Sequence, residues 1–179
     1  MKRSSTSPPP FEDLVDRYSE EIFVYIWRLF MGSTQEAEDG LQETYLRAFR
    51  AYPKLQHHSN LRAWLYKIAT NVANTELTRG TPEIPFVGED DFPRSGDVAV
   101  ELLIEQRISI EQVNTAVAKL PRKQRIALVM RKYQGFDYGE IARVLEISEG
   151  AARANVYQAV RRLRSEFQME EIGDGGGQR

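Results

Sequence analysis

The chain of 179 residues contains no cysteine and only two histidines. Without cysteine it can form neither a disulfide framework nor a thiolate metal site. The two histidines, His57 and His58, are adjacent, and no further metal-binding residues stand near them at a suitable spacing. We therefore predict that the protein uses no metal ion and no cofactor, and that both histidines are solvated residues of a loop.

Long apolar runs are also missing. No stretch approaches the roughly 20 apolar residues that span a bilayer. The first ten residues, MKRSSTSPPP, have basic residues but no apolar segment after them, so they do not form a secretory signal. These absences predict a cytoplasmic protein without membrane insertion.

Residues that could perform catalysis are equally scarce. A nucleophile requires a base within hydrogen-bond reach, and the two adjacent histidines provide no such arrangement. The glycines of GDGGGQR near the C-terminus lack the preceding strand and following helix of a phosphate-binding loop. The acidic residues between positions 36 and 43 fit a solvated or partner-binding helix face better than a catalytic carboxylate pair. The sequence predicts no enzymatic activity.

Charge is nearly balanced in the whole chain but unevenly distributed. The net charge of −2 provides no global attraction to nucleic acid. Residues 1–79 have ten basic and ten acidic side chains. Residues 80–105 have one basic and seven acidic side chains, and residues 106–179 have thirteen basic and nine acidic ones. This pattern predicts two modules joined by an acidic linker. The linker, placed at 80–104, is also rich in proline and glycine, which favours a flexible segment.

The first module, placed at 11–79, shows apolar residues three or four apart, which is typical of amphipathic helices. We expect helices over about 11–31, 33–53 and 60–79, with Ser33 and Asn60 as N-caps. The expected inward residues of the second helix are Ala37, Leu41, Tyr45, Ala48 and Tyr52. Those of the third helix are Leu61, Trp64, Leu65, Ile68, Val72 and Leu77. Aromatic and basic residues interleave from Arg62 to Lys67 in a way that weakly indicates single-strand binding, with Tyr66 and Lys67 pointing away from the core.

The second module, placed at 105–168, ends in a pair of short helices. A further helix precedes this pair. Pro121 suits its first turn, and Gly135 ends it. Over 136–164, a capping box of Asp137 and Glu140 begins one helix, and Ser148 can cap the next. Four residues of this last helix share one face at steps of four, four and three: Arg153, Tyr157, Arg161 and Arg164. A buried short helix followed by a helix with a basic face is typical of a DNA-binding helix-turn-helix, although an ordinary helix pair with a solvated cationic face remains an alternative.

No segment alternates polar and apolar residues as a strand does, so the predicted fold is all-α. It has two small helical domains joined by the flexible linker. The polar segments 1–10 and 169–179 are expected to be disordered tails.

Three stretches of the chain resemble two conserved regions of one protein family. EAEDGLQETYLRAFRAY, which begins at Glu36, and NLRAWLYKIATNVANTEL, which begins at Asn60, resemble region 2 of the sigma-70 family in its extracytoplasmic-function (ECF) group. LPRKQRIALVMRKYQGFDYGEIARVLEISEG, which begins at Leu120, resembles region 4 of the same group. The D-x-x-Q-E-x-x-L run from Asp39 and the L-P-x-x-x-R run from Leu120 are much more specific than a helix-turn-helix pattern alone.

The resemblance implies a sigma factor that binds bacterial core RNA polymerase, recognises promoter DNA and helps melt it. It implies a three-to-four-helix bundle for region 2 and a helix-turn-helix for region 4. The implied polymerase-binding residues are Asp39, Gln42, Glu43 and Leu46. The implied minus-ten contacts lie in the loop 56–60 and in the third helix: Asn60, Trp64, Lys67, Asn71, Asn74 and Arg79. The implied minus-thirty-five contacts are Ser148, Arg153, Tyr157, Arg161, Arg162 and Arg164.

The chain departs from the family pattern at several positions. Asn155 replaces a customary arginine, and Gln158 and Val160 stand where basic residues are frequent, so we expect minus-thirty-five binding to be weak or tuned to an unusual sequence. Glu146, Thr70 and Gly40 replace a customary glycine, arginine and apolar residue. Two other functions stay open: a stand-alone helix-turn-helix regulator, and a sigma-derived interaction factor with weakened promoter binding. The family also has anti-sigma partners, but no residue of this chain identifies one.

Overall fold

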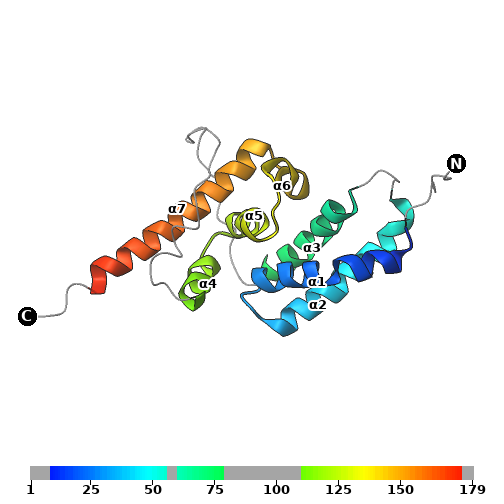
Figure 1. Ribbon diagram of the computed structural model, residues 1–179, viewed down its shortest axis with the longest axis horizontal. Helices are drawn as coiled ribbons and strands as arrows, with labels where there is room; N and C mark the ends of the chain where they lie inside the picture. Colours follow the sequence, from blue (N-terminus) through cyan, green and yellow to red (C-terminus); the bar gives the residue numbers. More distant parts are fainter. Residues whose placement is uncertain (1–8, 56–59, 79–109, 175–179) are drawn as a thin grey trace, which may run out of the picture. The chain divides into compact units, whose positions relative to one another are not determined.

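The computed structural model describes residues 9–55, 60–78 and 110–174, and all regular structure in these ranges is helical (Figure 1). The predicted all-α fold is confirmed. The predicted linker 80–104 lies outside the described residues. The helices are α1 (Phe11–Leu29), α2 (Thr34–Ala51), the 3-10 turn η1 (Tyr52–Lys54), α3 (Leu61–Thr78), α4 (Ile110–Ala118), α5 (Arg122–Tyr133), α6 (Tyr138–Leu145) and α7 (Glu149–Asp174).

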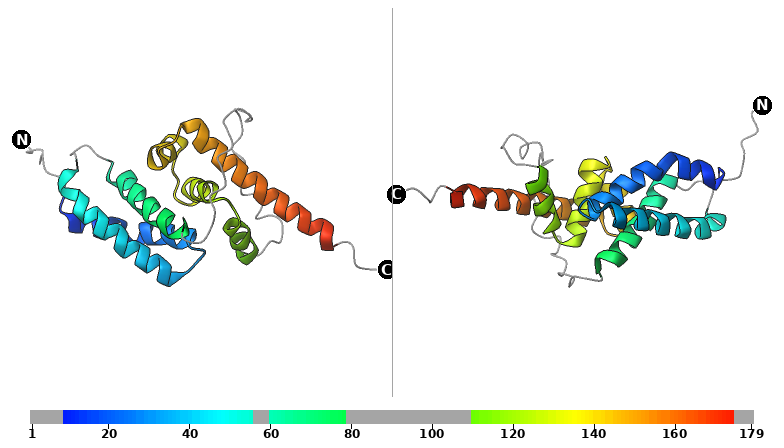
Figure 2. Two further views of the ribbon diagram at one scale, coloured as in Figure 1. Left: turned by 180° about the vertical axis from the view of Figure 1, so that it is seen from behind. Right: turned by 90° about the horizontal axis from the view of Figure 1, so that it is seen from below.

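The chain divides into two compact units, the first of which contains α1, α2 and α3. Each of these three helices packs against the other two, as the views in Figure 2 show. Its largest fully buried side chains come from α1 and α3: Leu14, Ile22, Tyr25, Ile26, Leu29, Leu65, Tyr66 and Val72.

Helix α2 faces its neighbours with small side chains. The buried residues of α2 are Ala37, Gly40, Thr44 and Ala48, whereas the expected inward residues Leu41, Tyr45 and Tyr52 are only half-buried. The prediction is confirmed for Ala37 and Ala48 and was wrong for the three larger residues, because small side chains make up the contact face. A Cβ atom added at Gly40 would lie 3.0 Å from Ile26 Cγ2 and 3.4 Å from Phe30 Cε2. Glycine therefore allows the close approach of α2 to α1, at a position where the resemblance leads us to expect an apolar residue.

Helix α3 is also rotated relative to the expected face. Tyr66, Ala69, Thr70 and Ala73 are buried together with Leu65 and Val72. The expected inward residues Leu61, Trp64, Ile68 and Leu77 are only half-buried. The prediction left Tyr66 and Thr70 outside the core because they are polar. Both are buried because their hydroxyl groups find hydrogen-bond partners inside the core, and this turns their face of α3 inward.

The turn between α1 and α2 confirms Ser33 as the N-cap of α2, whereas the C-cap of α1 is Phe30. Gly32 adopts a φ of 87° and donates its amide to Trp27 O at 2.9 Å, and Met31 has a φ of 57°. The Ser33 hydroxyl accepts the Glu36 amide at 3.4 Å and caps α2. Helix α2 ends at Ala51, two residues before Pro53.

The second unit contains α4, α5, α7 and most of α6. Helix α7, with 26 residues the longest of the described helices, packs against α5 and α4. The core of this unit includes Ile126, Met130, Phe136, Ile141, Ala152, Val156, Val160, Leu163 and Phe167. Helix α7 continues to Asp174, which corrects the predicted start of the C-terminal tail at residue 169.

The L-P-x-x-x-R run has a structural role at the join of α4 and α5. Leu120 is buried, and Pro121 immediately precedes α5. The Arg125 guanidinium donates to Ala118 O and, at 3.4 Å, to Leu120 O. These carbonyls lie where α4 has ended and have no further helical turn to bond to. Burial lowers the pKa of Arg125 from its usual value.

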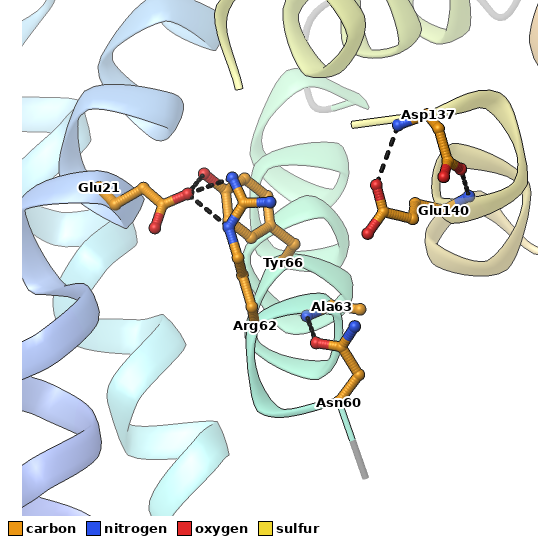
Figure 3. Close-up of polar contacts among 7 residues, drawn as sticks. All are labelled: Glu21, Asn60, Arg62, Ala63, Tyr66, Asp137 and Glu140. Carbon is orange, nitrogen blue, oxygen red and sulfur yellow. Dashed lines mark hydrogen bonds and ion pairs between the residues drawn. The ribbon is translucent and has the colours of Figure 1, made fainter. Parts of the chain in front are cut away.

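The local structure of the helix-turn-helix is as predicted. Asp137 and Glu140 form a reciprocal capping box, in which the Asp137 amide donates to Glu140 Oε2 at 2.9 Å and the Glu140 amide donates to Asp137 Oδ1 at 2.7 Å (Figure 3). The Ser148 hydroxyl accepts the Ala151 amide at 3.0 Å and caps α7. Glu146 occupies the turn between the two helices with a φ of 56°, so a residue with a Cβ adopts the conformation of the customary glycine.

This backbone conformation predicts a stabilising substitution. Glu146→Gly should raise the free energy of unfolding by about 1 kcal/mol, because glycine adopts the left-handed conformation without the steric cost of a Cβ. Thermal or urea unfolding followed by circular dichroism measures the change. Glu146→Ala is the matched control, since it removes the carboxylate but keeps the Cβ. Equal stability of the glycine and alanine variants would contradict the prediction.

Candidate nucleic-acid interface

The predicted polymerase-binding residues lie on the exposed side of α2. Asp39 and Gln42 are exposed, and Leu46 is 45% exposed. Glu43 accepts a hydrogen bond from Arg47 Nε at 2.6 Å one turn later. Because the small residues of α2 take the buried side, this acidic and apolar face is left to solvent.

The structure adds Phe49 to this face, which the sequence analysis missed. Phe49 is 59% exposed and follows Leu46 by three residues, so the two side chains lie on neighbouring turns of α2. Its ring lies edge-on to that of Phe11, with the ring centroids 5.3 Å apart. The ring of Phe11 is also 5.2 Å from that of Tyr52. The helical spacing from Leu46 could have indicated Phe49, but the prediction stopped where the family motif stops.

Most of the predicted minus-ten residues share one face of α3. Asn60, Trp64, Lys67, Asn71 and Asn74 follow one another at steps of four, three, four and three. Asn60 and Asn71 are exposed, and the other three are partly exposed. The predicted loop residues 56–59, including His57 and His58, lie outside the described residues, as does Arg79.

Side chains at the start of α3 have defined partners. Asn60 Oδ1 accepts the Ala63 amide at 3.0 Å, so the predicted N-cap is confirmed (Figure 3). The Trp64 ring lies 6.1 Å from the ring of Tyr52, at the end of α2. Asn74 Oδ1 is buried and has no hydrogen-bond partner among the described residues.

A polar cluster joins α1 to α3 behind this face (Figure 3). Glu21 Oε1 accepts hydrogen bonds from both the Nε and an NH2 group of Arg62, and from the Tyr66 hydroxyl at 2.8 Å. Next to it, the Tyr25 hydroxyl and Thr70 Oγ1 are 2.8 Å apart. Burial raises the pKa of both tyrosines, and for Tyr66 the hydrogen bond to Glu21 and the charge of Glu21 raise it further.

This cluster changes the interpretation of the aromatic and basic residues in α3. Tyr66 is fully buried, so the expectation that it points away from the core was wrong. Arg62 is paired with Glu21 and lies over the Tyr66 ring at 5.1 Å. Both residues therefore lie behind the predicted minus-ten face of α3 and support it. Thr70, at the position of a customary arginine, belongs to the same buried layer.

The basic face of α7 is exposed as predicted. Arg153, Arg161 and Arg162 are exposed, while Tyr157 and Arg164 are partly exposed. Ser148 is exposed but uses its hydroxyl for the helix cap. Asn155 is 7% exposed and donates its amide to Ala151 O at 2.8 Å, and Val160 is fully buried. These two departures from the family pattern therefore lie inside the unit.

Within the described ranges, no group of histidine, aspartate or glutamate side chains is arranged to hold a metal ion. None of their helices has both the length and the apolar character needed to cross a membrane.

Comparison with known proteins identifies both units. Residues 14–82 match the family model of Sigma-70 region 2, and residues 110–163 match that of Sigma-70, region 4. The chain is 32% identical over 158 residues to the RNA polymerase sigma-H factor of Pseudomonas aeruginosa, covering 83% of this chain and 81% of that protein. It is 25% identical over 166 residues to the ECF RNA polymerase sigma factor SigW of Bacillus subtilis, covering 88% of each.

Two solved structures share the fold. The sigma factor RpoE of Bartonella quintana, in complex with the anti-sigma factor NepR, has a TM-score of 0.66 at 19% identity and covers 88% of this chain and 96% of its own. CnrH, in complex with the cytosolic domain of CnrY, has a TM-score of 0.64 at 21% identity. The match covers 89% of this chain and 88% of the CnrH chain.

The Glu21 cluster yields a stability prediction. Glu21→Ala should lower the free energy of unfolding by roughly 1–3 kcal/mol, because it removes the carboxylate that accepts hydrogen bonds from Arg62 and from the buried Tyr66 hydroxyl. Urea unfolding measures the change.

Tyr66→Phe provides the matched test. This change should cost stability in the original chain but less in the Glu21→Ala variant, where the hydrogen bond from the hydroxyl to Glu21 is already lost. If the cost of Tyr66→Phe is the same in both backgrounds, the hydrogen bond does not couple the two residues.

Proposed function

Because the chain belongs to the ECF group of the sigma-70 family, we propose that one face each of α2, α3 and α7 performs a separate step of promoter recognition. As an ECF sigma factor, the protein binds core RNA polymerase and recognises promoter DNA. The observation that carries the assignment of faces is that each helix buries one side and exposes the residues that the family resemblance selects. We further propose that it acts in the cytoplasm and has no active site of its own.

The exposed face of α2 is the proposed docking surface for polymerase. It combines carboxylates at Asp39 and Glu43 with the exposed apolar side chains of Leu46 and Phe49. Carboxylates complement a basic partner surface and speed the encounter. Buried apolar and aromatic anchors usually contribute most of the binding energy of an interface. The acids would then guide association, and Leu46 and Phe49 would hold the complex.

The face of α3 is the proposed reader of the melted minus-ten element. The exposed amide of Asn71 can donate to and accept from base edges that become free when a strand separates, whereas Asn74, whose Oδ1 is buried, can offer only its NH2 group. Trp64, partly exposed beside Tyr52, offers a ring on which an unpaired base can stack. The energy of these contacts would offset part of the cost of unstacking the duplex. Lys67 and Arg79 would supply positive charge for the backbone.

Helix α7 is the proposed reader of duplex DNA at the minus-thirty-five element. Arg153 and Tyr157, near its N-terminal end, are the proposed base or phosphate readers, since a recognition helix enters the major groove with that end. Arg161, Arg162 and Arg164 are the proposed phosphate contacts, which position the helix without reading sequence.

An anti-sigma factor is a proposed further partner. Two proteins of the same fold were solved in complex with NepR and with the cytosolic domain of CnrY, the first of which is an anti-sigma factor. The exposed apolar side chains of Leu46 and Phe49 are candidates for such a contact as well as for polymerase. A partner covering them would prevent docking on polymerase.

Transcription with purified components tests the proposed function. We expect core RNA polymerase to start transcription at defined sites on bacterial genomic DNA only when this chain is added, and sequencing of the transcripts would give the promoter motif. A stand-alone regulator would instead bind duplex DNA without polymerase and would produce no factor-dependent start site. Failure to form a complex with core polymerase would exclude the sigma function.

The docking surface gives a separate prediction. Leu46→Ala and Phe49→Ala should each weaken binding to core polymerase by roughly 1–2 kcal/mol, which is about tenfold in Kd. Fluorescence anisotropy of the labelled full chain titrated with core polymerase measures the affinity. Gln35→Ala, at an exposed position in the first turn of the same helix, is the control and should leave the affinity unchanged. Unchanged affinity in both apolar variants would remove this face from the proposed interface.

A further inference from the structure

Arg153, the proposed base reader, is held by two groups in the second unit. Its guanidinium carbon lies 4.4 Å from the centre of the Tyr138 ring. One of its NH2 groups lies 3.3 Å from Glu149 Oε1, one helical turn earlier. Arg131, from α5, lies over the same ring at 4.9 Å. The ring of Tyr138 is thus a shared surface for arginines from two other helices.

The position of the ring is itself well defined. Tyr138 is the first residue of α6 and lies inside the capping box formed by Asp137 and Glu140. Arg131 donates to Phe136 O at 3.3 Å, two residues before Tyr138. The backbone on which Tyr138 stands is therefore tied both to its own helix and to α5.

Stacking on a ring suits an arginine that must read a base. A guanidinium lying on an aromatic face keeps its N–H donors in the plane, at its edges, where they can form two parallel hydrogen bonds to the O6 and N7 atoms of guanine. A flexible arginine would lose more side-chain entropy on binding than one already held. The ion pair with Glu149 involves only one NH2 group of the Arg153 guanidinium.

We propose that Tyr138 is a positioning residue for minus-thirty-five recognition: its ring orients the Arg153 guanidinium for bidentate contact with a base pair in the major groove. The inference rests on the proposed function of α7 as the reader of that element. Tyr138 acts through Arg153, so the first helix of the helix-turn-helix contributes to sequence specificity without itself reading a base. The hydroxyl group of Tyr138 is not required for this role.

Promoter selection from a random pool tests the proposal. The probe is a pool of duplex DNA with a fixed minus-ten region and start site and a fully randomised upstream window, transcribed by core polymerase with the full chain. Sequencing of the transcribed templates gives the base preference at each position. A base pair read by a bidentate arginine should be preferred roughly 5- to 150-fold over the others. The variants are Arg153→Ala, Arg153→Lys, Tyr138→Phe, Tyr138→Leu and Tyr138→Met.

The proposal expects three results. Arg153→Ala abolishes the preference at one or two base pairs, and Arg153→Lys does so too, because an ammonium group lacks the planar fork. Tyr138→Leu and Tyr138→Met weaken the preference at those same base pairs by about tenfold, while Tyr138→Phe retains it. Arg161→Ala, at an exposed arginine of the same helix, keeps every base preference but lowers binding and reduces the salt dependence by about one counterion. Circular dichroism checks that each variant folds, and the two ring-free variants guard against a folding failure in one of them.

The contrary results are distinguishable. If Arg153→Ala loses the preference but a folded ring-free variant keeps it, Tyr138 does not position Arg153, and the proposed function of α7 stands. If Tyr138→Phe loses the preference as fully as Tyr138→Leu, the hydroxyl rather than the ring matters, and the proposal is overturned. If Arg153→Ala keeps the original preference, the proposed reading role of Arg153 fails and this inference fails with it.

Discussion

The described structure depends on one constraint: each helix with a proposed function must bury one side completely while leaving the other side free for a partner. A short helix gains most of its stability from the apolar face that it packs against its neighbours. In α2 that face is made of small residues such as Ala37 and Ala48, and in α7 of alanine and valine from Ala152 to Val160. Close packing of small side chains leaves the charged and aromatic residues outside, where they can meet polymerase or DNA.

Polar residues inside the first unit serve the same constraint. Glu21 receives three hydrogen bonds from Arg62 and Tyr66, so a carboxylate, a guanidinium and a phenol are satisfied at the join of α1 and α3. Removing Glu21 would take from Arg62 and Tyr66 the carboxylate that both of them bond to, which is costly in a partly buried site. Such a cluster sets the rotation of α3 and thereby decides which residues face outward. The proposed minus-ten face is consequently determined from α1 as well as from α3 itself.

The sequence predicted the helices, their caps and the exposed faces better than it predicted the buried ones. Caps depend on neighbouring residues, so Ser33, Asn60 and the Asp137–Glu140 pair could be identified from spacing alone. The core of the first unit depends on contacts between residues distant in sequence, and apolar periodicity could not show that Tyr66 and Thr70 find buried partners. Phe49 was missed for a different reason, because the family motif ends at Leu46. Arg153 of α7 lies over the ring of Tyr138 of α6, and no local sequence pattern predicts this contact between two helices.

The departures from the family pattern take on a different meaning in the structure. The expectation of weak minus-thirty-five binding was based on missing cations at Asn155, Gln158 and Val160. Val160 is fully buried and Asn155 is bonded within its own helix, so neither position presents a side chain on the exposed face of α7. Of the three, only Gln158 is partly exposed.

The exposed face of α7 has several arginines, and their surroundings differ. Arg153 is held by a ring and a carboxylate, whereas Arg161 and Arg162 are exposed further along α7. A phosphate contact tolerates a mobile cation, but a base contact requires a defined direction. The number of cations is therefore a poor measure of how specifically the proposed recognition helix would read DNA. These surroundings favour a recognition helix whose specificity is concentrated near its N-terminal end and whose remaining arginines supply affinity.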